Sequence, residues 1–186
     1  AIGSPLPVVS SPDKNWVAIA RSQEVFIFHR DGQLKKTVGF EIASNVVLGF
    51  SPDSRFLSCL SGRGREVCLI DILNGIVSWK YNAGAVSMKV PLPERVDRRF
   101  VAGDICNGGK YVVVGERVQN CRIFGEKGEV LGQLELPDDS PMVSLRLSPE
   151  GRFLGVATAG HYEAYRGEVL RRSSGHLYVY ELSAAK

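Results

Sequence analysis

Four segments of the chain repeat the same order of turn and strand signals, and this repetition restricts the fold more than any other feature. Each segment has a cluster of tight-turn residues, Ser-Pro-Asp, Ser-Pro-Glu or Asn-Gly, and the clusters lie at 11–14, 51–54, 106–109 and 148–151. An apolar run follows each cluster, at 16–19, 56–60, 111–114 and 153–157. Short apolar runs bounded by turns are typical of buried β-strands. The chain is therefore predicted to be all-β.

Further strand signals complete each segment. A second apolar run occurs at 25–28, 67–70, 121–124 and 177–180. A hairpin signal then follows in the first three segments, at Asp31-Gly32, Asn74-Gly75 and Lys127-Gly128. A more polar outer strand follows it at 34–38, 77–81 and 130–136. With a strand before the first turn, a complete unit has four strands, A to D in chain order.

The spacing of the units predicts a β-propeller. Phe28, Ile70, Phe124 and Tyr180 lie on successive C strands, at intervals of 42, 54 and 56 residues. Four strands in a unit of about 42 residues are typical of a propeller blade. A β-sandwich would not explain why the Ser-Pro-Asp turn recurs at the same place in successive units. We expect one propeller domain over residues 1–186, with blades at about 6–41, 42–84, 85–137 and 138–186.

The last unit lacks a D strand, so the array is expected to be half or part of a ring. Propellers close their ring, typically with about four to eight blades, and closure removes exposed edges. Three arrangements are open. The chain forms half of an eight-bladed homodimer, it is a fragment or a subunit completed by another chain, or it closes as a small four-bladed ring. The expected partners therefore include a second copy or another chain.

The turn and strand phrases resemble known propeller repeats. The Ser-Pro-Asp turn before Trp16 and Phe56 is similar to that of WD-repeat and TolB-like propellers, and residues 107–115 and 75–79 are similar to phrases of quinoprotein-like repeats. The Trp-Asp pair of WD repeats is replaced by Phe28-His29, Ile70-Asp71, Phe124-Gly125 and Tyr180-Glu181. The Gly-His pair is absent too. The resemblance implies the propeller superfamily, whose TolB-like and quinoprotein-like members can accompany hydrolase or oxidoreductase activity.

Two insertions, at 86–99 and 160–175, are expected on the rim that carries the B–C and D–A connections. Long loops on a rigid scaffold concentrate function. Arginine is frequent in these connections and offers a planar fork to carboxylates and phosphates. The candidate binding residues are Arg63, Arg65, Arg95, Arg98, Arg99, His161, Tyr162, Tyr165, Arg166, Arg171 and Arg172. Neighbouring acidic residues make solvated loop charges the alternative interpretation.

These residues favour a non-catalytic protein–protein interaction scaffold whose partner is acidic. A propeller within a larger enzyme is the first alternative, and nucleic-acid binding through the arginines is the second. Tyr162 and Tyr165 are the only aromatics among the arginines, which ranks RNA below a protein partner. No catalytic, phosphate-binding or metal-binding motif is found, so no cofactor or metal is expected. The recurring Asp13, Asp53 and Glu150 are expected to cap turns.

Composition and charge set weaker limits. The formal net charge is +3, with 44% hydrophobic and 23% charged residues, as in a globular protein. No apolar run approaches the ~20 residues of a membrane-spanning helix. The lack of a signal peptide and of an Asn-x-Ser/Thr acceptor, with only four cysteines, favours the cytoplasm. Cys59 and Cys68 flank a predicted hairpin and are expected to face each other, which leaves a disulfide open.

Overall fold

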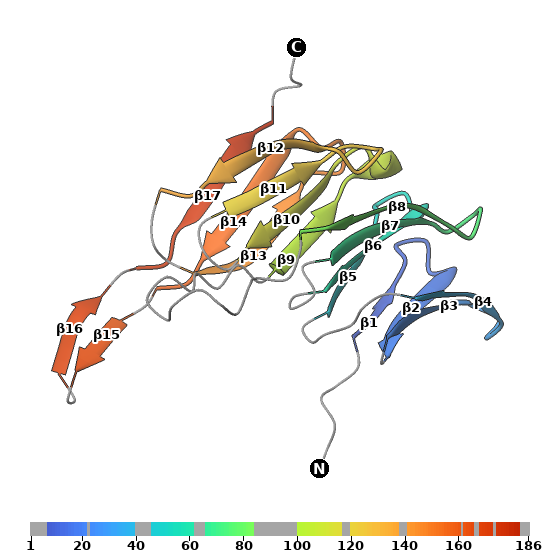
Figure 1. Cartoon of the computed structure of the whole chain (residues 1–186), viewed down its shortest axis with the longest axis horizontal. Coiled ribbons are helices and arrows are strands. Elements are labelled where there is room, and N and C mark those ends of the chain that lie inside the picture. The colour runs from blue at the N-terminus through green and yellow to red at the C-terminus, as the bar shows by residue number, and fades with distance from the viewer. Residues whose placement is uncertain are drawn as a thin grey trace.

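The described residues form four successive antiparallel sheets and a separate two-stranded hairpin, as seen in a computed structural model (Figure 1). The structure describes residues 7–21, 23–39, 46–61, 66–83, 100–116, 120–137, 141–160, 162–165, 168–172 and 174–182. The order of the four larger sheets follows chain order, so each of these four is one blade. Blade 1 consists of β1 (Val8–Ser10), β2 (Trp16–Arg21), β3 (Glu24–His29) and β4 (Leu34–Gly39). Blade 2 consists of β5 (Val46–Phe50), β6 (Phe56–Ser61), β7 (Glu66–Asp71) and β8 (Ile76–Asn82).

The other two blades differ in strand number. Blade 3 consists of β9 (Phe100–Ile105), β10 (Val112–Glu116), β11 (Asn120–Phe124) and β12 (Val130–Glu135). Blade 4 consists of β13 (Met142–Leu147), β14 (Phe153–Thr158) and β17 (Leu177–Glu181), with no outer strand among the described residues. The only described helix is the short 3-10 turn η2 (Asn107–Gly109). The prediction of an all-β propeller with a three-stranded last blade is confirmed.

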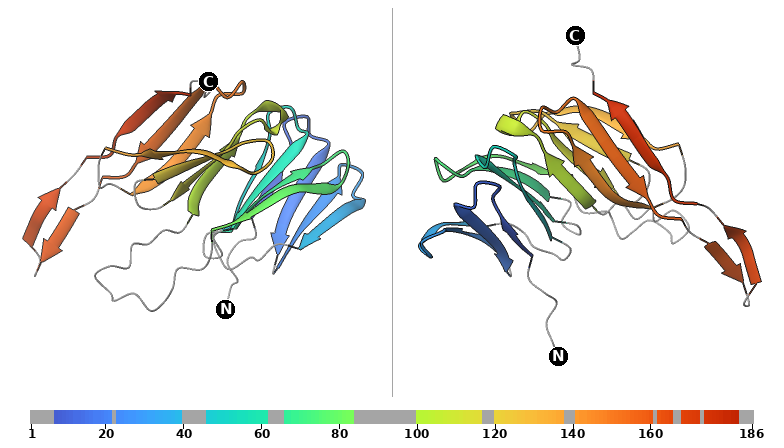
Figure 2. Two further views of the ribbon diagram at one scale, coloured as in Figure 1. Left: turned by 45° about the horizontal axis from the view of Figure 1, so that its top comes forward. Right: turned by 180° about the vertical axis from the view of Figure 1, so that it is seen from behind.

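The blades are arranged as an open fan. The first strands of neighbouring blades contact one another, β1 with β5, β5 with β9 and β9 with β13, and this row forms the inner side of the fan. Figure 2 shows the sheets side by side, with blade 1 at one end and blade 4 at the other. The chain therefore forms part of a ring, and its two end blades do not meet.

The core lies in three layers between successive blades. On blade 2, the cross-strand pair Leu57 and Ile70 faces blade 1, while the pair Leu60 and Val67 faces blade 3. Side chains alternate across a strand, so a sheet between two others must be apolar at both alternating sets of positions. This requirement explains the continuous apolar runs of the B and C strands.

The Ser-Pro-Asp turns hold the A and B strands together. The Ser11 hydroxyl accepts a hydrogen bond from the backbone N–H of Trp16 at 2.9 Å, and the Ser11 N–H donates to the Trp16 carbonyl at 2.9 Å. Ser51 and Ser148 repeat both bonds in blades 2 and 4. In blade 3 the sulfur of Cys106 accepts the equivalent N–H. One turn chemistry thus recurs in all four blades.

Neighbouring turns are also linked to each other. Each link joins the A–B turn of one blade to that of the next, which sets the relative position of the two sheets. The three bonds run from Asp13 N–H to Ser54 Oγ (3.0 Å), from Gly108 N–H to Asp53 Oδ2 (2.6 Å) and from Asn107 N–H to the Pro149 carbonyl (2.8 Å). The predicted turn role of Asp13 and Asp53 is confirmed, and that of Asp53 extends to the next blade.

Cys59 and Cys68 lie directly opposite each other on β6 and β7. The expectation that they face each other is confirmed. Both are fully buried free thiols, so the pair packs as two small apolar side chains on the face of blade 2 that contacts blade 1.

Candidate binding surfaces

The predicted site residues divide into two groups. Arg63, Arg65, Arg95, Arg98, Arg99, His161 and Arg166 lie outside the described residues. Tyr162 and Tyr165 lie on β15 (Tyr162–Tyr165), while Arg171 and Arg172 lie on β16 (Glu168–Arg172). The second insertion therefore contains a β-hairpin, where a loop was expected. We call the rim formed by the B–C and D–A connections the loop rim.

The hairpin β15–β16 stands away from the four blades (Figure 1). Its register places Tyr162 opposite Arg172 and Glu163 opposite Arg171, with a shift between Glu163 and Ala164. The two strands form a sheet of their own, so each has one edge that no other described strand pairs. Unpaired strand edges are templates for an added strand.

The charges of the hairpin strands balance. Glu163 and Glu168 offset Arg171 and Arg172 in the described part of the insertion. Any excess of positive charge therefore comes from arginines outside the described residues, at 63, 65, 95, 98, 99 and 166.

The base of the insertion is held tightly to blade 4. The N–H of Thr158 donates to the His176 carbonyl at 2.9 Å, and the N–H of His176 donates to Thr158 Oγ1 at 3.1 Å. A Cβ on Gly175 would lie 2.6 Å from the Thr158 carbonyl oxygen, so a larger residue would disturb this closure. The point where the insertion leaves the blade is thus fixed by backbone contacts.

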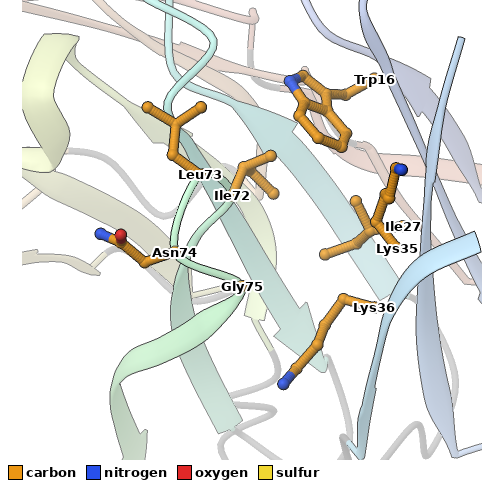
Figure 3. A pocket seen from close by; sticks show the side chains of 8 residues that line it. All are labelled: Trp16, Ile27, Lys35, Lys36, Ile72, Leu73, Asn74 and Gly75. Atoms are coloured by element: carbon orange, nitrogen blue, oxygen red, sulfur yellow. The ribbon is translucent and has the colours of Figure 1, made fainter.

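A small cleft lies between blades 1 and 2, near the opposite rim (Figure 3). Its volume is about 260 Å³. The indole of Trp16 and the side chains of Lys35 and Lys36 come from blade 1, and the turn at 72–75 comes from blade 2. Lys35 donates to Gln33 Oε1 at 2.7 Å. Sequence reasoning missed this cleft, because it depends on how the β7–β8 turn meets the neighbouring blade.

The recurring carboxylates of the A–B turns accept hydrogen bonds within their own turns. The Ser11 hydroxyl and the Asn15 N–H donate to Asp13 and lower its pKa to about 2. The pKa of Glu150 is also lowered, by hydrogen bonds from its own N–H and from Ser148. Carboxyls that stay ionised in this way cap turns and are poor general acids. The predicted turn role of Glu150 is confirmed as well.

Three of the buried thiols stay protonated. Burial raises the pKa of Cys59 well above its ordinary value, and it raises that of Cys121 to about 12. Burial also raises the pKa of Cys106. Nucleophilic chemistry requires the thiolate, so these three side chains behave as packing residues.

An ion pair with a buried carboxylate lies within blade 3, on the face that packs against blade 2. The Arg122 Nε atom is 2.9 Å from Glu116 Oε1, and Arg122 Nη1 donates to the Tyr81 hydroxyl at 2.7 Å. Tyr81 belongs to β8, so the cluster joins two blades. Sequence reasoning missed it, since Tyr81 and Arg122 are neighbours only because blade 3 packs on blade 2.

Among the described residues, no group of three His, Cys, Asp or Glu side chains could hold a metal ion. The same residues contain no helix long and apolar enough to cross a membrane.

Comparison with known proteins supports the fold. The chain has the fold of a β-propeller segment. No protein-family model and no curated protein matches it. Its structure is similar to 1237 chains of solved structures, and a fold shared this widely does not determine a function. Among them is Kuenenia stuttgartiensis hydrazine synthase, at a TM-score of 0.62 and 15% identity over 92% of this chain. The match covers 50% of the hydrazine synthase chain, so this chain spans half its length.

Proposed function

We propose that this chain is a non-catalytic interaction scaffold that binds an acidic protein segment through the loop rim. The observation that carries the proposal is the hairpin β15–β16, which extends from blade 4 and stands away from the sheets (Figure 1). Projecting elements on a rigid scaffold are the usual places of recognition. A partner strand can add to either free edge of the hairpin.

The residue types of the hairpin support this role. Tyr162 and Tyr165 on one strand and Arg171 and Arg172 on the other are of the types that dominate binding energy at protein interfaces. Arginine forms two parallel hydrogen bonds with a carboxylate, which favours an acidic partner. The arginines at 95, 98 and 99 belong to the segment between β8 and β9, which we expect on the same rim. They would supply positive charge that the balanced strands of the hairpin lack.

Within the propeller fold, we propose that the repeats are related to those of the WD-repeat, TolB-like and quinoprotein-like propellers. The support is the Ser-Pro-Asp turn, whose serine hydroxyl caps the following strand in blades 1 and 2. Blade 4 keeps the same bond with a Ser-Pro-Glu turn.

The test measures binding of a fluorescently labelled poly-glutamate peptide by anisotropy, at ~50 mM and ~200 mM salt. We expect the combined variant Arg98→Ala, Arg99→Ala, Arg171→Ala and Arg172→Ala to weaken binding at least roughly tenfold at low salt. Its salt dependence should fall as well, because fewer charged contacts remain. A second variant, Tyr162→Ala with Tyr165→Ala, should weaken binding with little change in salt dependence.

The matched control removes four positive charges from the opposite rim, by Lys14→Ala, Arg30→Ala, Lys110→Ala and Lys127→Ala. This variant should bind like the unmodified chain. Equal losses in both charge variants would show non-specific attraction and contradict the proposal. Tighter binding of an RNA probe, with the same dependence on the loop-rim arginines, would contradict the proposal of an acidic protein partner. It would show that the loop rim binds nucleic acid.

A further inference from the structure

Each interface between blades joins two faces of different kind. We call the side of a sheet that points to the next blade its following face, and the other side its preceding face. The following face of blade 1 carries Ala18, Ala20, Val25 and Ile27. These residues pack with the preceding face of blade 2, which carries Leu57, Cys59, Cys68 and Ile70. The same arrangement recurs between blades 2 and 3 and between blades 3 and 4.

The following face of blade 4 keeps this apolar pattern with no described blade against it. Leu177 stands at the position of Val25 in blade 1 and Val67 in blade 2. Val25 and Val67 are 0% exposed, whereas Leu177 is 74% exposed. Val179 stands at the position of Ile27 (2% exposed), yet it is 68% exposed. The sequence therefore keeps interface residues on a face that is open.

The rest of this face suits close packing of another sheet. In the cross-strand rows of blade 4, Leu177 lies beside Ala157, and Val179 lies beside Gly155. A Cβ on Gly155 would meet nothing closer than 3.9 Å, so the surface there is flat and uncovered. Phe153 lies on the same face and is exposed as well.

Blade 1 presents the complementary face at the other end of the fan. Its preceding face has two cross-strand rows, which run through Val8, Ile19, Phe26 and Thr37 and through Ser10, Val17, Phe28 and Leu34. Phe26 and Phe28 stand at the positions of Cys68 and Ile70, which are fully buried in blade 2. Val8 on the inner strand is 55% exposed.

The observed interfaces show how a fifth sheet would dock. Between blades, the A strand of the later blade contacts both the A and the B strand of the earlier one, as β9 does with β5 and β6 and β13 with β9 and β10. An added blade on blade 4 would therefore place its A strand over β13 and β14. In the described sheets, a preceding face packs against the following face of the blade before it. The preceding face of blade 1 has no such neighbour among the described blades, so it can pack against the following face of blade 4.

We propose that two copies of this chain pair head to tail, with blade 1 of each copy packed on blade 4 of the other. A head-to-tail interface forms a closed assembly when its rotation closes. Two fans of four blades give eight, within the range of about four to eight blades typical of closed propellers. This pairing covers both open faces of both copies. It uses the same face-to-face arrangement that joins blades within the chain.

The test is the mass of the chain in solution, by light scattering after size exclusion over about a hundredfold range of concentration. We expect a particle of twice the 20.3 kDa of one chain. Leu177→Glu with Val179→Glu should give a monomer, because it buries two charges in the interface. Val8→Glu should do the same from the other end. All three side chains are exposed within one chain, so the substitutions leave its own core intact.

Two controls make the result specific. Ile76→Glu is the matched control for Val8→Glu: it places one charge at a position of similar exposure (54% against 55%) on the outer strand of blade 2, and it should leave the dimer unchanged. A mixture of the blade 1 and blade 4 variants keeps one intact interface, so it should form a mixed dimer where each variant alone does not. A monomeric wild type or a larger open assembly would overturn the proposal. A dimer that only the blade 4 variant disrupts would overturn it too, by showing a blade 4 to blade 4 contact.

Discussion

At the scale of single residues, the serine and aspartate of the A–B turn decide where each blade starts. The Ser11 hydroxyl bonds both the Asp13 carboxylate and the backbone N–H of Trp16. The tight turn also requires a positive φ, which Lys14 and Ser54 adopt at 60° and 62° and which Gly151 adopts at 75°. Short-range bonds of this kind depend on residues at most five apart, which is why the sequence reveals them.

The Asp13 carboxyl predicts an acid dependence of stability. Its pKa in the folded chain is about 2, below its ordinary 3.8, because Ser11 and Asn15 donate to the ionised form. The stabilisation is therefore fully present above about pH 4 and is lost as the pH falls towards 2. Asp13→Asn should reduce the fall in melting temperature between these values. Thermal melts across this range provide the measurement, with the exposed Glu126→Gln as control. An unchanged fall in the Asp13→Asn variant would refute this role.

At the scale of elements, alternation of side chains along each strand produces sheets that are buried on both faces. This holds for blades 2 and 3, which have a neighbour on each side. Contacts between blades also restrict which residue can occupy a single position. Gly128, in the turn before β12, has a φ of +80°, and a Cβ there would lie 2.8 Å from the Trp79 ring of blade 2. The turn signal at this position is visible in the sequence, but its contact with Trp79 is not.

The ion pair of Glu116 and Arg122, on the face of blade 3 that packs against blade 2, predicts a large contribution to stability. Arg122→Met removes the cation from beside a buried carboxylate and should destabilise the fold by about 3–5 kcal/mol. Adding Glu116→Leu should recover most of this loss, because the buried charge is then gone. Urea unfolding measures both variants.

The exposed pair of Arg152 and Glu181 supplies the control for that experiment. Their side chains are 63% and 59% exposed, so Arg152→Met should cost less than about 1 kcal/mol. Similar losses of unfolding free energy in the Arg122→Met and Arg152→Met variants would contradict the prediction, because burial of Glu116 would then not increase the stabilisation by the ion pair.

At the scale of the whole molecule, the open fan is the feature with the widest consequences. Its two end faces carry residues of the kind that the inner blades bury, so association should contribute to stability. We expect the melting temperature to rise with protein concentration, because dimer formation stabilises the folded chain by mass action. The variant with Leu177→Glu and Val179→Glu should melt at one temperature at all concentrations. Scanning fluorimetry over about a hundredfold range tests this, and a concentration-independent wild type would contradict it.

The number of repeats, the order of strands and the open D position of the last blade could all be predicted from the sequence. Those features follow from turn chemistry and from the alternation of apolar residues, which act over a few positions. The role of Asp13, Asp53 and Glu150 could be predicted for the same reason.

The contacts between blades, by contrast, emerged only from the folded chain. The hairpin β15–β16, the contact of Tyr81 with Arg122 and the cleft beside Trp16 could not be predicted from the sequence. Each depends on how sheets pack, and packing joins residues that are tens of positions apart. The exposure of Leu177 and Val179 belongs here as well. The sequence shows that both residues are apolar. That their face of blade 4 is uncovered depends on how the described blades stack.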